Sequence, residues 1–406
     1  MDTSIPKPGA RNALRVAVVT ETYPPEINGV ARTVGLMVES LCERGHEVQL
    51  VRPRQRDAPA RSLDEGPEER LVLGLPIPFY RHLQMGLAPP RLLHREWTQK
   101  RPDLVHVVTE GPLGWAAVST ARRLRIPVCS DFHTNFHSYS RHYGLGVFSG
   151  IVSRYLRALH NRTDCTLVPT DEMRANLETL AFERVKVVGR GVDGRLFSPA
   201  RRSERLRATW GCMGSEAVVL YVGRLAPEKN LGLFVEAALA MRAIDASLRV
   251  VLVGDGPQSA ELRARHPDFV FAGMRTGGDL AEHYASADVF VFPSTTETFG
   301  NVTLEAMASG LAVLAYDYAA ARQYLRHGAS ALLAAPGDRV TFVRLAAQLA
   351  GHPELRSRLR SEARRAAEAA SWSRAFDDLE RVLRGLVAAN RAGLDEVRED
   401  SVHVET

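Results

Sequence analysis

The stretch Val289-Phe-Val-Phe-Pro-Ser-Thr-Thr-Glu-Thr-Phe-Gly-Asn-Val-Thr-Leu-Glu305 decides the fold class of this chain. Four consecutive apolar residues precede Pro293, which is the pattern of a short buried strand that ends at a loop. Residues 301–309 then predict a helix, and Gly310 stands where a helix commonly ends. A buried strand, a loop and a helix in this order indicate an α/β fold with a parallel sheet.

Two carboxylates belong to this stretch. Glu297 lies in the loop beyond the carboxyl end of the strand, and Glu305 lies about one turn into the helix. The start of that helix, at Gly300-Asn301, offers unpaired backbone N–H groups and the positive end of a helix dipole, which favour an anion. This combination suits a ligand that carries both hydroxyls and phosphates. Two glutamates eight residues apart are common, so the pair alone does not identify a site.

A second predicted strand supplies cations. Residues 217–222 are apolar, and Gly223-Arg-Leu-Ala-Pro-Glu-Lys229 follows at the carboxyl end of that strand, where open α/β sheets bind their ligands. The guanidinium of Arg224 and the ammonium of Lys229 are the groups that a diphosphate needs. An arginine at a strand end is more often a surface residue, so the prediction rests on the two stretches together.

The chain opens with another strand–loop–helix unit. Residues 15–20 predict a strand, and the loop that follows ends in Gly29 before a helix over residues 30–44. Gly29 fits either a plain tight turn or a close approach of phosphate or sugar to the helix start. The dinucleotide pattern Gly-x-Gly-x-x-Gly is absent here, and after residues 248–253 it fails because Ser259 replaces the third glycine. A nicotinamide site is therefore unsupported.

A histidine follows a third strand. Residues 127–130 are expected to deliver Asp131-Phe-His-Thr-Asn135 to a strand end, which makes His133 a candidate site residue and Asp131 and Asn135 weaker ones. A lone histidine is more often structural, and the residues alone leave both interpretations open. The aromatic and polar segment 137–144 fits an acceptor-pocket wall or a packed loop equally well.

Three motifs make this chain resemble a known family. Glu297-x7-Glu305 with Phe299-Gly300, the run Gly-Arg-Leu-x-x-Glu-Lys-Asn from Gly223, and Val253-Gly-Asp-Gly-Pro257 look like those of the retaining GT-B glycosyltransferases of family 4. Within that family, Gly189-Arg-Gly-Val-Asp193 is most similar to GDP-mannose-dependent α-mannosyltransferases and to glycolipid-forming sulfoquinovosyl- and glucosyltransferases. The resemblance covers residues 14–383.

The resemblance implies two Rossmann-like, doubly wound α/β domains that face each other across a cleft. Residues 14–197 are expected to form the acceptor-side domain, and residues 198–371 the domain that binds the nucleotide sugar. Residues 372–390 are expected to form a helix that crosses back onto the first domain. The acidic tail, residues 391–406, is expected to be disordered.

The same resemblance implies roles for individual residues. Arg224 and Lys229 would hold the diphosphate and stabilise the charge of the leaving group. Glu305 would accept the ribose hydroxyls, and Glu297 a hydroxyl of the donor sugar. The expected catalytic residues are His133, Arg224, Lys229 and Glu297. The expected donor-binding residues are Gly29, Arg224, Lys229, Met274, Arg275, Glu297, Phe299, Gly300, Asn301 and Glu305, of which Met274 and Arg275 would contact the base through their backbone.

The expected reaction moves a hexose, with mannose favoured, from a GDP- or UDP-sugar to a lipid or glycan hydroxyl with retention. No Asp-x-Asp sequence occurs in the chain, so we expect no metal ion and no cofactor besides the donor substrate. Two alternatives stay open: a non-catalytic protein that binds nucleotide sugars, and a nucleotide-sugar epimerase on the same fold. No nucleic-acid motif is present.

Composition limits the setting. The 406 residues are 45% hydrophobic and 24% charged, as in globular proteins, and they contain neither a membrane-spanning run nor the apolar core of a signal peptide. We expect a cytoplasmic protein with four reduced core cysteines. The net charge of +5 divides into +6 over residues 1–199 and −1 over the remainder. The basic stretch 79–101 has Lys or Arg at positions 81, 91, 95, 100 and 101. It fits a solvated helix face, an acceptor-side patch or a patch against the anionic inner face of the cell membrane.

Overall fold

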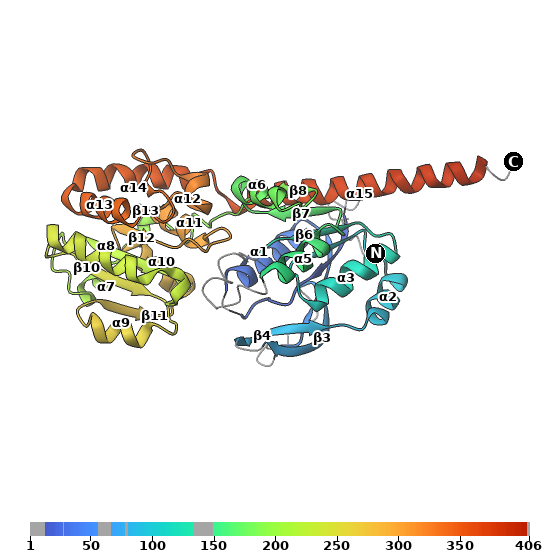
Figure 1. Cartoon of the computed structure of the whole chain (residues 1–406), viewed down its shortest axis with the longest axis horizontal. Coiled ribbons are helices and arrows are strands. Elements are labelled where there is room, and N and C mark those ends of the chain that lie inside the picture. Colours follow the sequence, from blue (N-terminus) through green and yellow to red (C-terminus); the bar gives the residue numbers. More distant parts are fainter. Residues whose placement is uncertain (1–12, 27, 56–65, 78–79, 134–148, 404–406) are drawn as a thin grey trace, which may run out of the picture.

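Two sheets organise the chain, and each is wound with helices on both faces (Figure 1). The computed structural model describes residues 13–26, 28–55, 66–77, 80–133 and 149–403. We call β1–β8 with α1–α6 the first lobe, and β9–β14 with α7–α14 the second lobe. Figure 1 shows the two lobes side by side, with the last helix, α15, lying along the first lobe.

The first sheet has eight strands in the order β4-β3-β2-β1-β5-β6-β7-β8. All neighbours are parallel except β3 and β4, which pair antiparallel. The strands are β1 Arg15–Val19, β2 Glu47–Pro53, β3 Glu68–Ile77, β4 Tyr80–Leu87, β5 Leu104–Val107, β6 Val128–Asp131, β7 Cys165–Val168 and β8 Val185–Val187.

The second sheet has six parallel strands in the order β11-β10-β9-β12-β13-β14. They are β9 Val218–Val222, β10 Arg249–Val253, β11 Val270–Gly273, β12 Val289–Phe292, β13 Ala312–Tyr316 and β14 Leu332–Ala334. In both sheets the strand order reverses beside the first strand, between β1 and β5 and between β9 and β12. Doubly wound sheets bind ligands beyond the strand ends at such reversals.

The helices fill the connections between strands. In the first lobe they are α1 Gly29–Glu43, α2 Pro90–Gln99, α3 Pro112–Arg123, α5 Ser149–His160 and α6 Asp171–Thr179. In the second lobe they are α7 Glu204–Thr209, α8 Leu231–Ile244, α9 Ser259–Arg265, α10 Gly277–Ala285, α11 Asn301–Ala308, α12 Ala319–Tyr324, α13 Arg339–Gly351 and α14 Pro353–Glu368. The last helix is α15 Trp372–His403.

Strand alternation decides which helix covers which face of the first sheet. Side chains of successive strand residues point to opposite faces, so Val16 and Val18 pack on one side and Ala17 and Val19 on the other. The first side is covered by α1 and α15, the latter through Leu379, Leu383 and Val387. The other side is covered by α2 and α3, where the buried Trp97 donates a hydrogen bond of 2.9 Å to Gln49.

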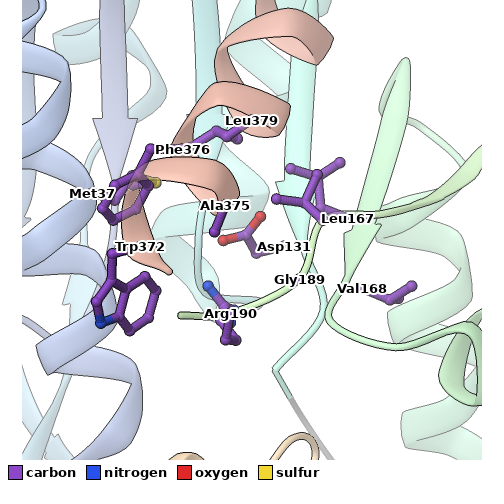
Figure 2. Close-up of a pocket in the computed structure, with 11 residues that line it drawn as sticks. Met37, Asp131, Leu167, Val168, Gly189, Arg190, Trp372, Ala375, Phe376 and Leu379 are labelled. Atoms are coloured by element: carbon purple, nitrogen blue, oxygen red, sulfur yellow. The ribbon is translucent and has the colours of Figure 1, made fainter. Parts of the chain in front are cut away.

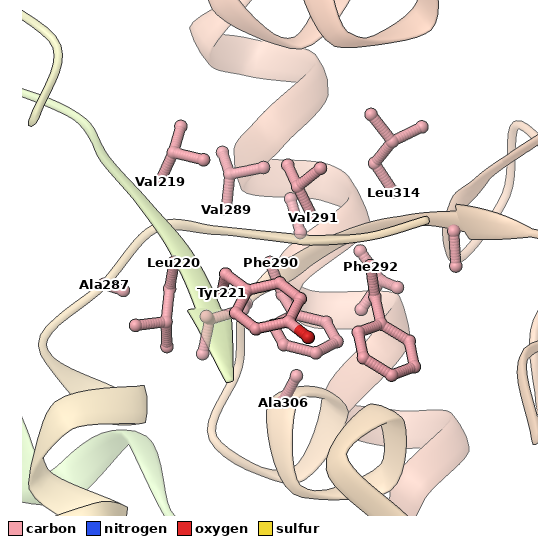
Figure 3. Packing of buried hydrophobic residues seen from close by; sticks show 14 of the residues in the cluster. Val219, Leu220, Tyr221, Ala287, Val289, Phe290, Val291, Phe292, Ala306 and Leu314 are labelled. Atoms are coloured by element: carbon pink, nitrogen blue, oxygen red, sulfur yellow. The ribbon is translucent and has the colours of Figure 1, made fainter. Parts of the chain in front are cut away.

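The stretch that decided the fold class lies at the centre of the second lobe. Figure 3 shows Val289 and Val291 on one face of β12, and Phe290 and Phe292 on the other face beside Tyr221. All four β12 side chains are buried, and Pro293 follows the last of them. The helix α11 ends at Ala308, with Gly310 in the left-handed region at φ +73°. The predicted α/β, doubly wound fold is confirmed.

Two segments differ from the sequence-based expectations. We expected residues 391–406 to be disordered, but α15 continues as a helix to His403, because no proline interrupts it after Asn390; residues 404–406 lie outside the described residues. The stretch 79–101, for which a solvated helix face was one interpretation, forms the strand β4 over residues 80–87 and a helix only over residues 90–99, because β4 pairs with β3 as the edge of the first sheet. The predicted boundary at residues 197–198 lies between the last strand of one sheet and the first of the other, and the domain limits themselves stay a prediction.

Within the described ranges, no helix has the length and apolar character needed to cross a bilayer.

The packing of α15 on the first lobe gives a stability prediction. Leu383 is fully buried among α1 and strand residues, so Leu383→Ala should lower the free energy of unfolding by about 2–5 kcal/mol. Arg381 lies two residues away with an exposed side chain, and Arg381→Ala is the control, with an expected change within about 0.5 kcal/mol. Urea unfolding of the full chain measures both. Equal stability of the two variants would contradict the packing.

Candidate active site

The loops after β9, β10 and β12 come together at the carboxyl edge of the second sheet. The backbone N–H of Gly254 donates to Gly273 O at 2.8 Å, and Thr296 Oγ1 donates to Glu228 O at 3.0 Å. Gly254 has φ +131°, and a Cβ there would lie 2.0 Å from Gly223 O. Only glycine allows these two loops to touch, which explains the Val253-Gly-Asp-Gly-Pro257 motif in physical terms.

The predicted cations face carboxylates in this edge. Lys229 Nζ lies 2.5 Å from Glu297 Oε1, which also accepts a hydrogen bond of 2.7 Å from Ser294 Oγ. The Arg224 side chain is 45% exposed and lies 3.5 Å from the buried Glu228. Both cations belong to the loop after β9, next to the strand-order reversal where doubly wound sheets bind their ligands.

Glu305 lies deeper, inside the second lobe. Its Oε2 accepts a hydrogen bond of 3.1 Å from Tyr284, and its Oε1 accepts one from Arg32 of α1, in the first lobe. Burial raises the pKa of Glu305, while the charge of Arg32 and the bond from Tyr284 act in the opposite direction. Neither partner was found from the sequence, because Arg32 is 273 residues away in the chain and Tyr284 looks like an ordinary core aromatic.

The helix starts of the two lobes meet here. Gly300, at φ +89°, precedes α11, and a Cβ on Gly29 at the start of α1 would lie 3.8 Å from Asn301 Nδ2. The first N–H groups of a helix have no partner within the helix, so two such ends facing each other favour an anion between them. Gly29, Gly300 and Asn301 are therefore brought together, as expected of a shared site.

The other predicted donor residues are placed differently. Met274 is exposed in the loop after β11, and Arg275 is tied to its own loop through Ala272 O at 2.9 Å and Asp279 at 3.0 Å. The ring of Phe299 is buried edge-to-face against Tyr324, with centroids 6.1 Å apart. Phe299 therefore packs in the core of the second lobe rather than at the predicted donor site.

His133 belongs to a polar network at the carboxyl edge of the first sheet. Its backbone N–H donates to Glu110 Oε1 at 3.2 Å, and Arg190 donates to its Nδ1 at 3.2 Å. The Nε2 atom, which then carries the proton, lies 3.3 Å from Asp131 Oδ2. The Asn135 candidate and segment 137–144 lie outside the described residues.

The electrostatics of this network favour ionised carboxylates. Burial alone would raise the pKa of Asp131, but His106 at 2.9 Å and His133 outweigh it and hold the pKa well below its usual range. The pKa of Glu110 is likewise lowered, against the effect of burial, by His160 and His133. Burial lowers the pKa of Arg190. Glu110, His106 and His160 carried no sequence motif by which they could have been found.

A small cavity lies behind the network. Figure 2 shows the Asp131 carboxylate and Arg190 at its polar side, while α1, β7 and α15 supply apolar walls. Those walls keep bulk water away from Asp131, which agrees with its buried state. The apolar lining residues labelled there are Met37, Leu167, Val168, Trp372, Ala375, Phe376 and Leu379.

Comparisons with known proteins agree with this geometry. The description "Glycosyltransferase Family 4" matches residues 27–195, and "Glycosyl transferases group 1" matches residues 216–352. The chain is 37% identical over 308 residues to a GDP-mannose-dependent alpha-mannosyltransferase of Mycolicibacterium smegmatis, which covers 75% of this chain and 80% of that protein. It is 26% identical to an alpha-monoglucosyldiacylglycerol synthase of Streptococcus pneumoniae over 75% of this chain and 71% of that protein.

The fold agrees as well. The structure of sucrose-phosphate synthase from Thermosynechococcus elongatus superposes with a TM-score of 0.74 at 19% identity, covering 93% of this chain and all of that one. The two lobes thus form a GT-B fold. The chain belongs to the group 1, family 4 glycosyltransferases, and it transfers a sugar from a nucleotide sugar to an acceptor.

Glu21, in the loop after β1, gives a pH prediction. Its carboxylate accepts backbone N–H bonds from Gly86 at 3.1 Å and Leu113 at 3.2 Å, and burial raises its pKa from 4.5 to about 7. The folded state therefore binds this proton more tightly than the unfolded state. The stability gained is fully present below pH 4.5 and is lost as the pH rises through 7.

Glu21→Gln keeps the site neutral at every pH. Against wild type, the variant should be nearly unchanged at pH 4.5 and more stable at pH 8 by up to about 3 kcal/mol. Urea unfolding at the two pH values measures this, with Glu39→Gln on the exposed side of α1 as the control. The same difference at both pH values would refute the raised pKa.

Proposed function

We propose that this chain is a retaining, metal-independent hexosyltransferase that takes mannose from GDP-mannose and passes it to a lipid or glycan hydroxyl. The observation that carries the proposal is the approach of the α1 and α11 helix starts, with the Lys229–Glu297 pair beside Gly300. A diphosphate placed at the α11 helix start would be held by the positive end of that helix and by Arg224 and Lys229, which follow β9.

The sugar and ribose ends of the donor follow from this placement. Glu297 lies four residues before the α11 helix start at Asn301. It accepts a hydroxyl of the hexose once Lys229 turns to the phosphate. Glu305, deeper in the second lobe, accepts the ribose hydroxyls, and the backbone at Met274 and Arg275 faces the base. GDP is favoured because a relative 37% identical to this chain is named as GDP-mannose-dependent, and UDP-sugars are the next candidates.

The reaction needs charge stabilisation more than a separate base. Arg224 and Lys229 stabilise the charge that develops on the leaving diphosphate. The leaving phosphate, on the same face of the sugar as the incoming hydroxyl, takes the acceptor proton, which accounts for retention. Both ring nitrogens of His133 already face Arg190 and Asp131, so we assign His133 to positioning those two groups near the donor sugar rather than to proton transfer.

The acceptor is assigned by position and by relatives. The first lobe carries the positive excess and faces the donor across the cleft. A relative named as an alpha-monoglucosyldiacylglycerol synthase favours a lipid acceptor, and we place the reaction at the cytoplasmic surface of a membrane. Anionic lipid would be attracted by the basic first lobe.

The Arg224→Ala variant tests the leaving-group role. Release of GDP from GDP-mannose, followed with a membrane-lipid extract as acceptor, should fall about 100-fold or more, because a charge-stabilising donor is lost. Arg339→Ala removes an exposed ion pair with Glu236 on the same lobe and is the control, with unchanged turnover. Near-normal turnover of Arg224→Ala would remove Arg224 from the site.

Metal independence is tested separately. Full transfer activity is expected in excess EDTA, since protein cations hold the diphosphate. The assay compares initial rates with EDTA, without EDTA and after added magnesium. Abolition by EDTA with recovery on magnesium would show that a divalent ion bridges the diphosphate.

A further inference from the structure

Arg32 reaches from the first lobe into the second. It lies in the first turn of α1, three residues after Gly29, and its Nη1 donates to Glu305 Oε1. The guanidinium carbon lies 5.4 Å from the centroid of the Phe197 ring. Phe197 packs edge-to-face against Tyr284, which donates to the other Glu305 oxygen. A carboxylate, an aromatic face and a phenol thus form a seat for one guanidinium.

The Arg32 guanidinium supplies a charge partner for the buried carboxylate of Glu305. The Glu305 side chain is only 7% exposed, whereas the Arg32 side chain is 40% exposed. A buried carboxylate without a positive or hydrogen-bonding partner is costly, and Tyr284 supplies only one neutral bond. Arg32 therefore provides the charge that Glu305 requires when no ligand is bound.

The ion pair between Arg32 and Glu305 occupies the carboxylate that we propose binds the ribose hydroxyls. The body of α11 and the ring of Tyr284 cover Glu305 from within the second lobe, and its side toward the first lobe is the side from which Arg32 enters. A ribose that reaches Glu305 from the cleft must come from that same side. The guanidinium and the ribose hydroxyls therefore compete for the same carboxylate.

We propose that Arg32 occupies the ribose subsite in the ligand-free protein and is exchanged for the ribose hydroxyls when the nucleotide sugar binds. This inference rests on the proposed function. It makes Arg32 a residue of the first lobe that sets nucleotide affinity: the donor must break an ion pair between the lobes before its ribose can be held. It also ties donor binding to a change in the contact between α1 and α11.

Removal of Arg32 should therefore tighten nucleotide binding, which is unusual for a cation beside a diphosphate site. Calorimetry with GDP, and with UDP in parallel, should give a Kd for Arg32→Ala about tenfold lower than that of wild type. Arg322→Ala is the matched control, because Arg322 also pairs across the lobes, with Glu172 at 3.4 Å, but away from Glu305. Its Kd should stay at the wild-type value.

The ribose hydroxyls provide a second, independent readout. Replacing GDP by 2′,3′-dideoxy-GDP should weaken binding to Arg32→Ala more than to wild type, since only wild type recovers the Arg32–Glu305 pair when the hydroxyls are missing. If Arg32→Ala is poorly folded by thermal unfolding, Arg32→Gln, which keeps the length without the charge, replaces it in both measurements.

The outcomes separate the exchange from the proposed function. Weaker or unchanged GDP binding by Arg32→Ala, or an equal dideoxy penalty in both proteins, overturns the exchange, and weaker binding would make Arg32 a direct phosphate contact. The ribose role of Glu305 is judged on wild type alone. It fails if dideoxy-GDP binds wild type as well as GDP does and Glu305→Gln leaves GDP affinity unchanged.

Discussion

A buried carboxylate must keep a partner in every state of the protein, and Glu305 is the carboxylate on which this site depends. It lies on α11, whose first residue is Asn301 and whose N-terminus is the proposed phosphate site. Its partner in the ligand-free protein comes from the other lobe. One ion pair therefore connects the donor site, the charge state of the second lobe and the relative position of α1 and α11.

The folds of the two lobes explain why such a contact can exist. Each sheet reverses its strand order beside its first strand, and each reversal leaves a helix start pointing away from the sheet: α1 after β1 and α11 after β12. The α1 and α11 starts approach each other at Gly29 and Asn301. Arg224 and Lys229 follow β9 in the second lobe, and the Glu110–His133–Asp131 network follows strands of the first lobe. The apolar cores behind them are ordinary, and the chemistry is confined to the loops.

Much of this could be predicted from the sequence, for identifiable reasons. Strands such as β12 and β13 can be predicted because they are apolar runs next to Pro293 and Gly310. Gly223 and Gly254 of the motifs lie in loops whose backbones touch. Arg224, Lys229, Glu297 and Glu305 lie within two short stretches, so local spacing was enough to propose them together. The structure places Lys229 against Glu297, and the roles of all four toward a donor stay predictions. Arg32, Tyr284 and Glu110 were missed because their partners are set by how sheets and lobes pack. The helical continuation of α15 past Asn390 was missed because an acidic composition was taken as disorder, although it is compatible with helix.

The position of the bound donor decides whether these four side chains form the active site. A crystal structure of the wild-type protein with intact GDP-mannose is the most direct test. The account predicts the diphosphate at the α11 helix start between Arg224 and Lys229, with the ribose hydroxyls on Glu305 and the hexose near Glu297. A nucleotide sugar lodged away from these four side chains would contradict it.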